Sequence, residues 1–427
     1  SDLPTQTANA ADIRTALRRG TIVYDRDNSE KHGDYLAALK FFNNFHHVDE
    51  LPAGAYPKYL VRFDANSTAD VPKLVKFAND ADLRVSVRSG GYQSAYTSVI
   101  NVVDDRATKR KDFMLLDFGN LKRIVVDAAN RRVTVQPGVT YRELWQETIK
   151  YGLHFPGPHA ERVNVAGFAL GGGFGYGSRS LGSGADNIDS VKIITSSNQG
   201  FQPITVDSKH HADLLYGVRG AGSFLGVVTE LTLKLHPLVP KPPTTPSLNG
   251  TQVKVTQALS IFPASQAKTI LDFYGNFDYN TAPTNLETEV VFSSDSDGNR
   301  QYILASRNYA TTVSSATAAA LQKITDFTNT IPNHLNLNNA IGYDSLQTST
   351  SSQWEVPDLA YYAEDTFVPA PLPDGLKKAL IDRWNVVPSP QSTIILNTGT
   401  WTPPGTALSA LDFNHTYSLG KSRMDCL

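Results

Sequence analysis

The feature that most constrains this chain is a glycine-rich stretch in its first half, AGFALGGGFGYGS at residues 166–178. Glycine loses more backbone freedom on folding than any other residue, which costs roughly 0.5–1 kcal/mol per position relative to alanine. The stretch is uncharged and stands between a polar loop and the strand-like VKIIT at residues 191–195. A cost repeated at so many positions predicts that another group passes very close to this backbone.

A second glycine turn lies in VRSGGYQSAYTS, residues 87–98, and follows a segment with the alternating pattern of a strand. Glycines in that position let backbone N–H groups approach an anion such as a phosphate, although an isolated Gly-Gly pair is more often an ordinary tight turn. Neither turn matches GxxxxGK followed by Ser or Thr, or a GxGxxG that opens a helix after the first strand. A nicotinamide-type Rossmann site is therefore disfavoured.

The residues before about position 240 predict two α/β halves, each with its own glycine turn. Apolar periodicity predicts a βαβ unit that ends on the first turn, and a capping box of Thr140 and Glu143 predicts a helix that stops at Gly152. The predicted elements are strands at 59–64 and 83–89 with a helix at 67–82 between them, a strand at 113–119, a hairpin at 123–138, strands at 191–195 and 226–237, and a helix around HADLLYGVRGAG.

A proline-rich connector, PLVPKPPTTP at residues 237–246, follows and predicts a domain boundary. Beyond it, strand-like segments joined by tight turns alternate with helical ones, which predicts an antiparallel sheet with helices on one face. The expected division is residues 1–240, 241–400 and a C-terminal segment 401–427. The fold class expected from these patterns is α+β.

Composition excludes several classes of partner. The 39 basic and 41 acidic residues leave a formal net charge of −2, so no surplus basic field is present for nucleic acid or anionic lipid. No apolar run approaches the roughly 18–20 residues of a membrane span. Cys426 is the one cysteine, which excludes an intrachain disulfide and a thiolate metal cluster.

The sequence says less about metal binding and about where in or outside the cell the protein is found. The pairs His46-His47 and His210-His211 are adjacent in sequence, so on a strand they would face opposite ways, and no metal site is expected. The chain has no initiator Met and carries sequons at Asn66, Asn249 and Asn414, but about that many arise by chance in a chain this rich in Asn, Ser and Thr. Secretion and a cytoplasmic location are both open, and a soluble protein is expected.

Three ordered blocks together carry a resemblance to a known family. Residues 87–98, 155–195 and 213–237 resemble the FAD-binding module of the berberine-bridge-enzyme-like oxidases, a branch of the vanillyl-alcohol-oxidase flavoprotein family with a PCMH-type FAD-binding domain. The resemblance implies two α/β subdomains that clasp FAD, a separate substrate domain whose sheet covers the isoalloxazine ring, and a C-terminal segment that returns toward the FAD domain. FNHTYSLGKSRMDCL, at 413–427, matches that returning segment poorly.

The resemblance also implies which residues contact FAD. One group would wrap the diphosphate and reach toward the flavin, a second would line its other side, and one residue would lie near the adenine. In that order they are Ser89, Gly90, Gly91, Tyr92, Gln93 and Ser94; Val163, Gly167, Gly172, Gly173 and Gly175; and Val228.

Two positions depart from the family pattern. Most relatives have a flavin-bonded histidine after the Gly-Gly pair, where this chain has Tyr92, and many have a flavin-bonded cysteine where this chain has Ala160. A tyrosyl link at Tyr92 is a minor alternative. We therefore expect dissociable, non-covalent FAD, and the loss of both bonds predicts a weaker oxidant.

The implied activity is oxidation of an alcohol, amine or phenolic carbon of a bulky organic molecule, such as a secondary metabolite or oligosaccharide, with hydride transfer to flavin N5 and O₂ as a potential electron acceptor. Such chemistry needs a base. In LAYYAEDTF, at 359–367, Tyr362 and Glu364 share a face and are the candidates for this base, although a half-buried strand is the commoner role for such a pattern. His154 and His159 lie in the loop expected at the flavin edge, and Asp186-Asn187 is expected to bond local backbone.

Two other functions are open. The same flavoprotein fold can serve a redox-neutral cyclase, isomerase or dehydratase of secondary metabolism, which the missing attachment residues favour. A binding protein that has lost its cofactor is the third alternative. The intact glycine turns argue against it, because without a ligand substitution there would relieve their entropic cost.

Overall fold

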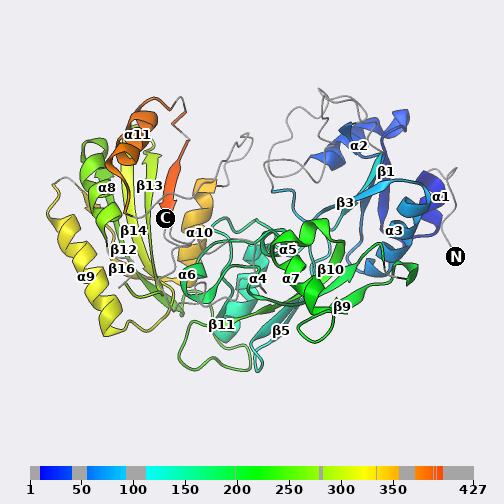
Figure 1. Ribbon diagram of the computed structural model, residues 1–427, viewed down its shortest axis with the longest axis horizontal. Helices are drawn as coiled ribbons and strands as arrows, with labels where there is room; N and C mark the ends of the chain where they lie inside the picture. The colour runs from blue at the N-terminus through cyan, green and yellow to red at the C-terminus, as the bar shows by residue number, and fades with distance from the viewer. Residues whose placement is uncertain are drawn as a thin grey trace.

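In the computed structural model, the described helices and strands pack into three units, each built on one sheet (Figure 1). Residues 10–40, 55–92, 112–197, 199–277, 282–332, 334–354, 371–387, 389–390 and 392–397 are described. The hypothesis for 359–367, including Tyr362 and Glu364, and the pair His46-His47 lie outside these ranges, as do Gln93 and Ser94.

The first unit is a four-stranded sheet in the order β1-β2-β4-β3. Its strands are β1 Ile22–Asp25, β2 Tyr59–Arg62, β3 Arg84–Arg88 and β4 Phe113–Asp117, and its helices are α1 Ala10–Thr15, α2 His32–Leu39 and α3 Val71–Asp80. Strand β4 lies between β2 and β3 and is parallel to both, which explains why all five residues of FMLLD are buried. The predicted strand–helix–strand order of this unit is confirmed, with β4 inserted between its two strands.

The second unit is an antiparallel sheet in the order β5-β6-β10-β8-β9. Its strands are β5 Ile124–Asp127, β6 Arg132–Val135, β8 Ile188–Ile194, β9 Ile204–Val206 and β10 Val227–Lys234; the short pair is β7 Leu153–His154 with β11 His236–Pro237; and the helices are α4 Tyr141–Thr148, α5 Val165–Leu170, α6 Ser178–Leu181 and α7 Ala212–Ala221. The predicted hairpin is present as β5 and β6, with Asp127 opposite Arg132.

Local signals position α4. The hydroxyl of Thr140 accepts the N–H of Glu143 at 3.3 Å, and Oε2 of Glu143 accepts the N–H of Thr140 at 2.8 Å, so the capping box is confirmed. A short 3₁₀ turn continues the helix to Gly152, whose φ of +62° ends it in the left-handed conformation that glycine tolerates.

The third unit is an antiparallel sheet in the order β15-β12-β14-β13-β17, with β16 also paired to β12. Its strands are β12 Lys254–Pro263, β13 Leu286–Ser294, β14 Arg300–Asn308, β15 Leu335–Asn336, β16 Asn339–Gly342 and β17 Ile394–Asn397, and its helices are α8 Ala267–Asn276, α9 Ser315–Asn329, α10 Tyr343–Trp354 and α11 Asp374–Asn385. Helices α8, α9 and α11 cover one face, as Figure 1 shows. The expected α+β fold with an antiparallel sheet flanked by helices is confirmed.

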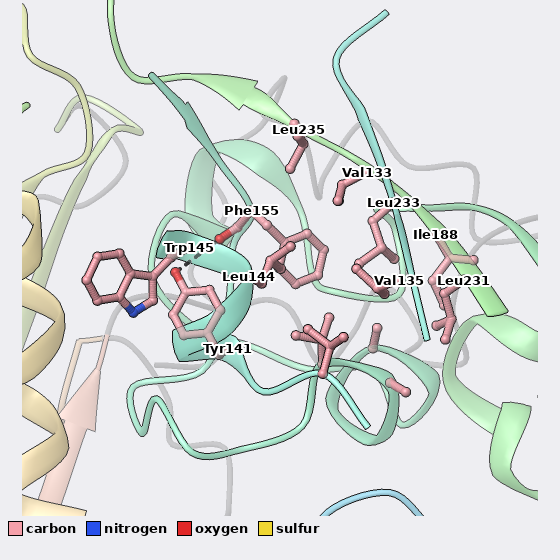
Figure 2. Packing of buried hydrophobic residues seen from close by; sticks show 14 of the residues in the cluster. Val133, Val135, Tyr141, Leu144, Trp145, Phe155, Ile188, Leu231, Leu233 and Leu235 are labelled. Carbon is pink, nitrogen blue, oxygen red and sulfur yellow. Dashed lines mark hydrogen bonds between the residues drawn. The ribbon is translucent and has the colours of Figure 1, made fainter. Parts of the chain in front are cut away.

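The hydrophobic cores of the second and third units meet at helix α10. The core of the third unit lies between its sheet and the three covering helices, and includes Phe292 and Trp384. The core of the second unit, shown in Figure 2, packs β6 and β10 against α4, and Trp145 lies at its edge, where the indole contacts Tyr343 of α10. Because α10 joins this core, the second and third units share buried side chains, and the opposite face of the third sheet points toward the second unit.

Candidate functional site

The two glycine segments lie against each other at the junction of the first and second units. A Cβ placed on Gly90 would be closer than 3.0 Å to the side chain of Asn164, which precedes α5. A Cβ placed on Gly167, within α5, would lie 3.3 Å from Oγ of Ser89. The turn after β3 therefore rests on the first turn of α5, and only glycine allows that approach at position 90.

The first turn has donors that the chain itself does not use. Within the described part of the chain, the backbone N–H groups of Ser89, Gly90 and Gly91 donate to no acceptor. Gly91 has a φ of +67°, so the chain reverses at this point. Tyr92 follows and is half-buried. Successive amides in such a turn form a concave surface that binds an anion.

The second glycine segment is packed mainly against its own protein. Gly172 and Gly173 have φ values of +114° and +75°, and their carbonyls accept the N–H groups of Ala185 and Gly184, both at 2.7 Å. A Cβ at Gly173 would be closer than 3.0 Å to Phe168. The glycines here are required by close internal packing, a cause that the sequence pattern does not distinguish from a ligand.

Other residues assigned to the cofactor lie around this junction. The carbonyl of Val163 accepts the N–H of Tyr141 at 2.9 Å, which places the loop before α5 on the start of α4. Gly175 packs on the carbonyl of Gly157, where a Cβ would be closer than 3.0 Å. Val228 is buried in β10, opposite Ile193 of β8, within the second core. Contact of these residues with FAD stays a prediction.

A group of charged residues on the third sheet faces the second glycine segment. Glu287 and Glu289 lie two residues apart on β13, so their side chains share a face, and Arg307 lies opposite Glu287 on β14. Arg307 donates to Glu289, and Nδ2 of Asn397 donates to the other oxygen of Glu289 at 3.3 Å. Glu287, Glu289 and Arg307 are each more than nine-tenths buried.

The two carboxylates differ in their pKa. Burial raises the pKa of Glu287 to about 7, against the opposing effect of the N–H groups of Arg179 and Gly177 that it accepts. Burial acts in the same direction on Glu289, but the guanidinium of Arg307 holds the pKa of Glu289 below its usual range. Glu289 is therefore an anion at neutral pH, while Glu287 is close to its midpoint.

Aromatic rings connect this polar face to the loop expected at the flavin edge. The rings of His159 and Tyr176 stack with their centres 4.1 Å apart, and the centres of the stacked rings of Tyr176 and Tyr309 are 5.3 Å apart. The guanidinium of Arg307 lies 5.7 Å from the ring centre of Tyr176. Burial lowers the pKa of His159, while Glu289 raises it and Arg307 lowers it, so the imidazole is neutral at pH 7. The residue as a whole is only partly buried, although the imidazole itself is enclosed by the protein.

Two polar atoms of this cluster are buried with no partner among the residues described. They are the hydroxyl of Tyr309 and Nε of Arg307. A buried donor without an acceptor is costly, and in native proteins it often marks a position that a ligand or water completes. These two groups could therefore donate hydrogen bonds to a molecule bound next to His159.

His154 has a different place from His159. It is fully buried, and burial lowers its pKa to about 4. Its Nε2–H donates to the carbonyl of Tyr176 at 2.9 Å, and its Nδ1 accepts the hydroxyl of Tyr343 at 2.6 Å. Tyr343 also contacts the hydroxyl of Tyr141 at 3.2 Å. His154 thus links β7 to α10 inside the protein.

The remaining candidates make local contacts. Ser183 donates to the Asp186 carboxylate at 2.7 Å through its hydroxyl, and Nδ2 of Asn187 donates to the carbonyl of Ser183 at 2.8 Å, as expected for a pair that bonds local backbone and side chains. His210 is exposed and pairs with Asp207 at 3.0 Å. Over the described ranges, no three His, Cys, Asp or Glu side chains gather as metal ligands would.

Sequence reasoning missed Glu287, Glu289 and Arg307. A signal for them exists: in LETEVVF, at 286–292, two carboxylates alternate within a strand whose other residues are typical of a buried one. Charges inside a strand of this kind are expensive unless they are paired. That pattern predicts a partner cation on a neighbouring strand, which RQYILASRNY supplies as Arg307.

Comparison with known proteins identifies the module that contains both glycine turns. Residues 59–199 match the FAD binding domain family. An FAD-linked oxidoreductase from Dictyostelium discoideum is 34% identical over 169 residues, which cover 40% of this chain and 34% of that protein. (R)-6-hydroxynicotine oxidase from Paenarthrobacter nicotinovorans is 31% identical over 173 residues, which cover 40% of this chain and 35% of that enzyme.

Solved structures extend the likeness to nearly the whole chain. A variant of berberine bridge enzyme superposes with a TM-score of 0.71 at 17% identity, and the match covers 98% of this chain and 78% of that one. Residues 59–199 are therefore an FAD binding domain. The chain as a whole has the fold of the berberine-bridge-enzyme-like structures. The matched region spans about a third of each of the two sequence relatives.

The geometry of the site fits FAD. The diphosphate of a dinucleotide requires N–H donors, and the turn at Ser89, Gly90 and Gly91 has three that the described chain does not use. Among the described residues, a Cβ at Gly167 would meet Oγ of Ser89 alone within 4 Å. The donors of the first turn and the exposed start of α5 therefore lie side by side where a diphosphate would bind.

Proposed function

We propose that this protein is an FAD-dependent oxidoreductase that oxidises an alcohol, amine or phenolic carbon of a bulky organic molecule, such as a secondary metabolite or an oligosaccharide. The FAD binding domain and the oxidoreductases among its relatives support the class of reaction. FAD, when bound, accepts a hydride at N5 and passes the electrons on, with O₂ as the expected acceptor.

The observation that carries the proposal is the position of His159. Its neutral imidazole stacks on Tyr176 and lies near the carboxylate of Glu289. As a hydride leaves the substrate carbon with its electron pair, an imidazole nitrogen of His159 takes the proton from the substrate hydroxyl or amine. Glu289 then stabilises the imidazolium, while Arg307 keeps Glu289 ionised. The earlier candidates Tyr362 and Glu364 lie outside the described residues and stay a prediction, while the geometry of the described residues supports His159 and Glu289 for this role.

We propose further that FAD is held without a covalent bond. The chain has Tyr92 and Ala160 at the two customary attachment positions, and Ala160 is buried. The test is acid precipitation of the purified protein with an absorbance spectrum from 350 to 500 nm. Flavin released into the supernatant supports dissociable FAD, and flavin retained in the pellet contradicts it.

The reaction is tested by anaerobic reduction. Addition of substrate without oxygen should bleach the flavin absorbance of the wild-type protein, and His159→Gln should slow bleaching by about 10²–10⁴-fold, the usual contribution of a general base. The variant should regain rate as pH rises, because substrate that has already lost its proton needs no base. An unchanged rate in the variant would exclude His159.

The redox-neutral alternative rests on the same two positions. Without covalent attachment at Tyr92 or Ala160, FAD is the weaker oxidant that this family pattern implies. A cyclase, isomerase or dehydratase would turn over with the flavin oxidised throughout and with no peroxide formed. A stopped-flow absorbance trace recorded alongside a peroxide assay distinguishes the two functions.

A further inference from the structure

The second glycine segment is held by a reciprocal pair of buried side chains that crosses to the third sheet. Oε1 of Glu287, on β13, accepts the N–H groups of Gly177 at 3.0 Å and Arg179 at 3.1 Å. The Arg179 guanidinium donates in turn to the carbonyls of Leu286 at 2.8 Å and Ala282 at 3.2 Å. Glu287 is 6% exposed and Arg179 is fully buried, so water does not compete for these bonds.

The backbone that Glu287 binds has little structure of its own. Helix α6 is a single turn, Ser178–Leu181, which has too few hydrogen bonds to be stable alone. Gly177 before it has a φ of +90°. The segment 175–179 therefore depends on contacts from outside for its conformation. Besides Glu287, these contacts come from Gly157 against Gly175 and from His154 beside Gly177.

We propose that Glu287 is a positioning residue for FAD: by binding the amides of Gly177 and Arg179, it holds the glycine segment 171–177 in the conformation that the cofactor requires. FAD affinity then depends on the sheet of the third unit, because β13 carries Glu287. This inference rests on FAD binding by the domain at 59–199, and not on the oxidation proposed above.

The experiment measures the Kd of FAD for the apoprotein by quenching of flavin fluorescence, so no turnover is needed. Glu287→Ala removes two buried hydrogen bonds to the backbone and should weaken FAD binding by about tenfold or more. Glu287→Gln keeps an oxygen acceptor at the same place and should restore the Kd to within about threefold of wild type.

The matched control is Thr288→Val. Thr288 is the next residue on β13, and its side chain points to the opposite face, where its hydroxyl lies 2.9 Å from that of Ser306. Loss of this buried hydrogen bond should lower the melting temperature and leave the Kd unchanged. The inference is overturned by a folded Glu287→Ala protein with the wild-type Kd, or by Thr288→Val weakening FAD binding equally.

A measurement on the wild-type protein covers the case in which Glu287→Ala does not fold. Amide hydrogen exchange at Gly177 and Arg179 should slow when FAD is added, because the cofactor and Glu287 favour the same backbone conformation. Equal exchange with and without FAD would overturn the inference. A wild-type protein that binds FAD but oxidises nothing would refute the proposed function alone.

Discussion

The two glycine segments look alike in sequence but differ in what surrounds them. The turn at Ser89–Gly91 has amides that the described chain leaves unused, whereas Gly173 and Gly175 press on protein atoms. Although Gly90 packs on Asn164, the first turn keeps three amides for which the described chain has no acceptor, whereas the second segment is held by packing and by Glu287 of the third sheet. A glycine run can therefore mark a cofactor site while most of its glycines serve the fold.

The sharpest test of this difference is Gly175→Ala. The new Cβ would be closer than 3.0 Å to the backbone carbonyl of Gly157, which cannot move away as a side chain can. We expect the free energy of unfolding to fall by about 3 kcal/mol or more, the upper part of the range for overpacked sites. Urea denaturation measures it. A loss below about 1 kcal/mol would show that position 175 has room, and the contrast with the first turn would fail.

The second prediction concerns pH and the Glu287 contact. The pKa of Glu287 is about 7 in the folded protein, against 4.5 as its ordinary value, so its contribution to stability is greatest below pH 4.5. As pH rises from 4.5 to 7 the unfolded chain releases its proton first, and roughly 3 kcal/mol of stability is lost before the curve levels off. Glu287→Gln should remove this component. Parallel pH profiles of unfolding for the two proteins would contradict the assigned pKa.

A smaller effect on the free energy of unfolding is expected at Tyr309, whose ring stacks on Tyr176 of the second glycine segment. The hydroxyl of Tyr309 is buried and has no partner in the described structure, so Tyr309→Phe should raise the free energy of unfolding of the ligand-free protein by about 1 kcal/mol. If the substrate uses this hydroxyl, kcat/KM should fall at the same time. Destabilisation by more than 1 kcal/mol would mean that the hydroxyl is bonded in solution.

The smallest effect on stability is expected at Gly167. It is exposed on α5, and of the residues that the structure describes its added Cβ would meet Oγ of Ser89 alone, at 3.3 Å. Alanine favours a helix over glycine, which offsets the tight contact, so unfolding should change by less than about 1 kcal/mol. FAD binding should nevertheless weaken by about tenfold, because the methyl group occupies the surface next to the turn. An unchanged Kd would place the cofactor elsewhere.

Two helices show how much of the fold could be predicted from the sequence. Thr140 and Glu143 predicted the start of α4 because a capping box is local chemistry. Helix α10 was missed: YDSLQTSTSSQW has almost no apolar periodicity, and the helix is fixed by Tyr343 and Leu346, which enter the core of the second unit. Tertiary packing overrides weak propensity in such a segment.

The candidate site shows the same limit. The glycine turns could be identified from the sequence because runs of glycine are unusual in any structural context. The pairing of Glu289 with Arg307, and of Glu287 with the start of α6, depends on strand register and on contact between units far apart in sequence. Neither contact follows from a local pattern, so the sequence indicated the glycine turns and not the charged residues of the third sheet.

Asn164 sets the spacing between the first and second units, since its amide lies where Gly90 has no side chain. A longer residue at 164 is expected to push the turn after β3 outward, and glycine there to let the turn move inward. One buried side chain therefore acts as a spacer between the two units, and its length fixes how far apart they stand.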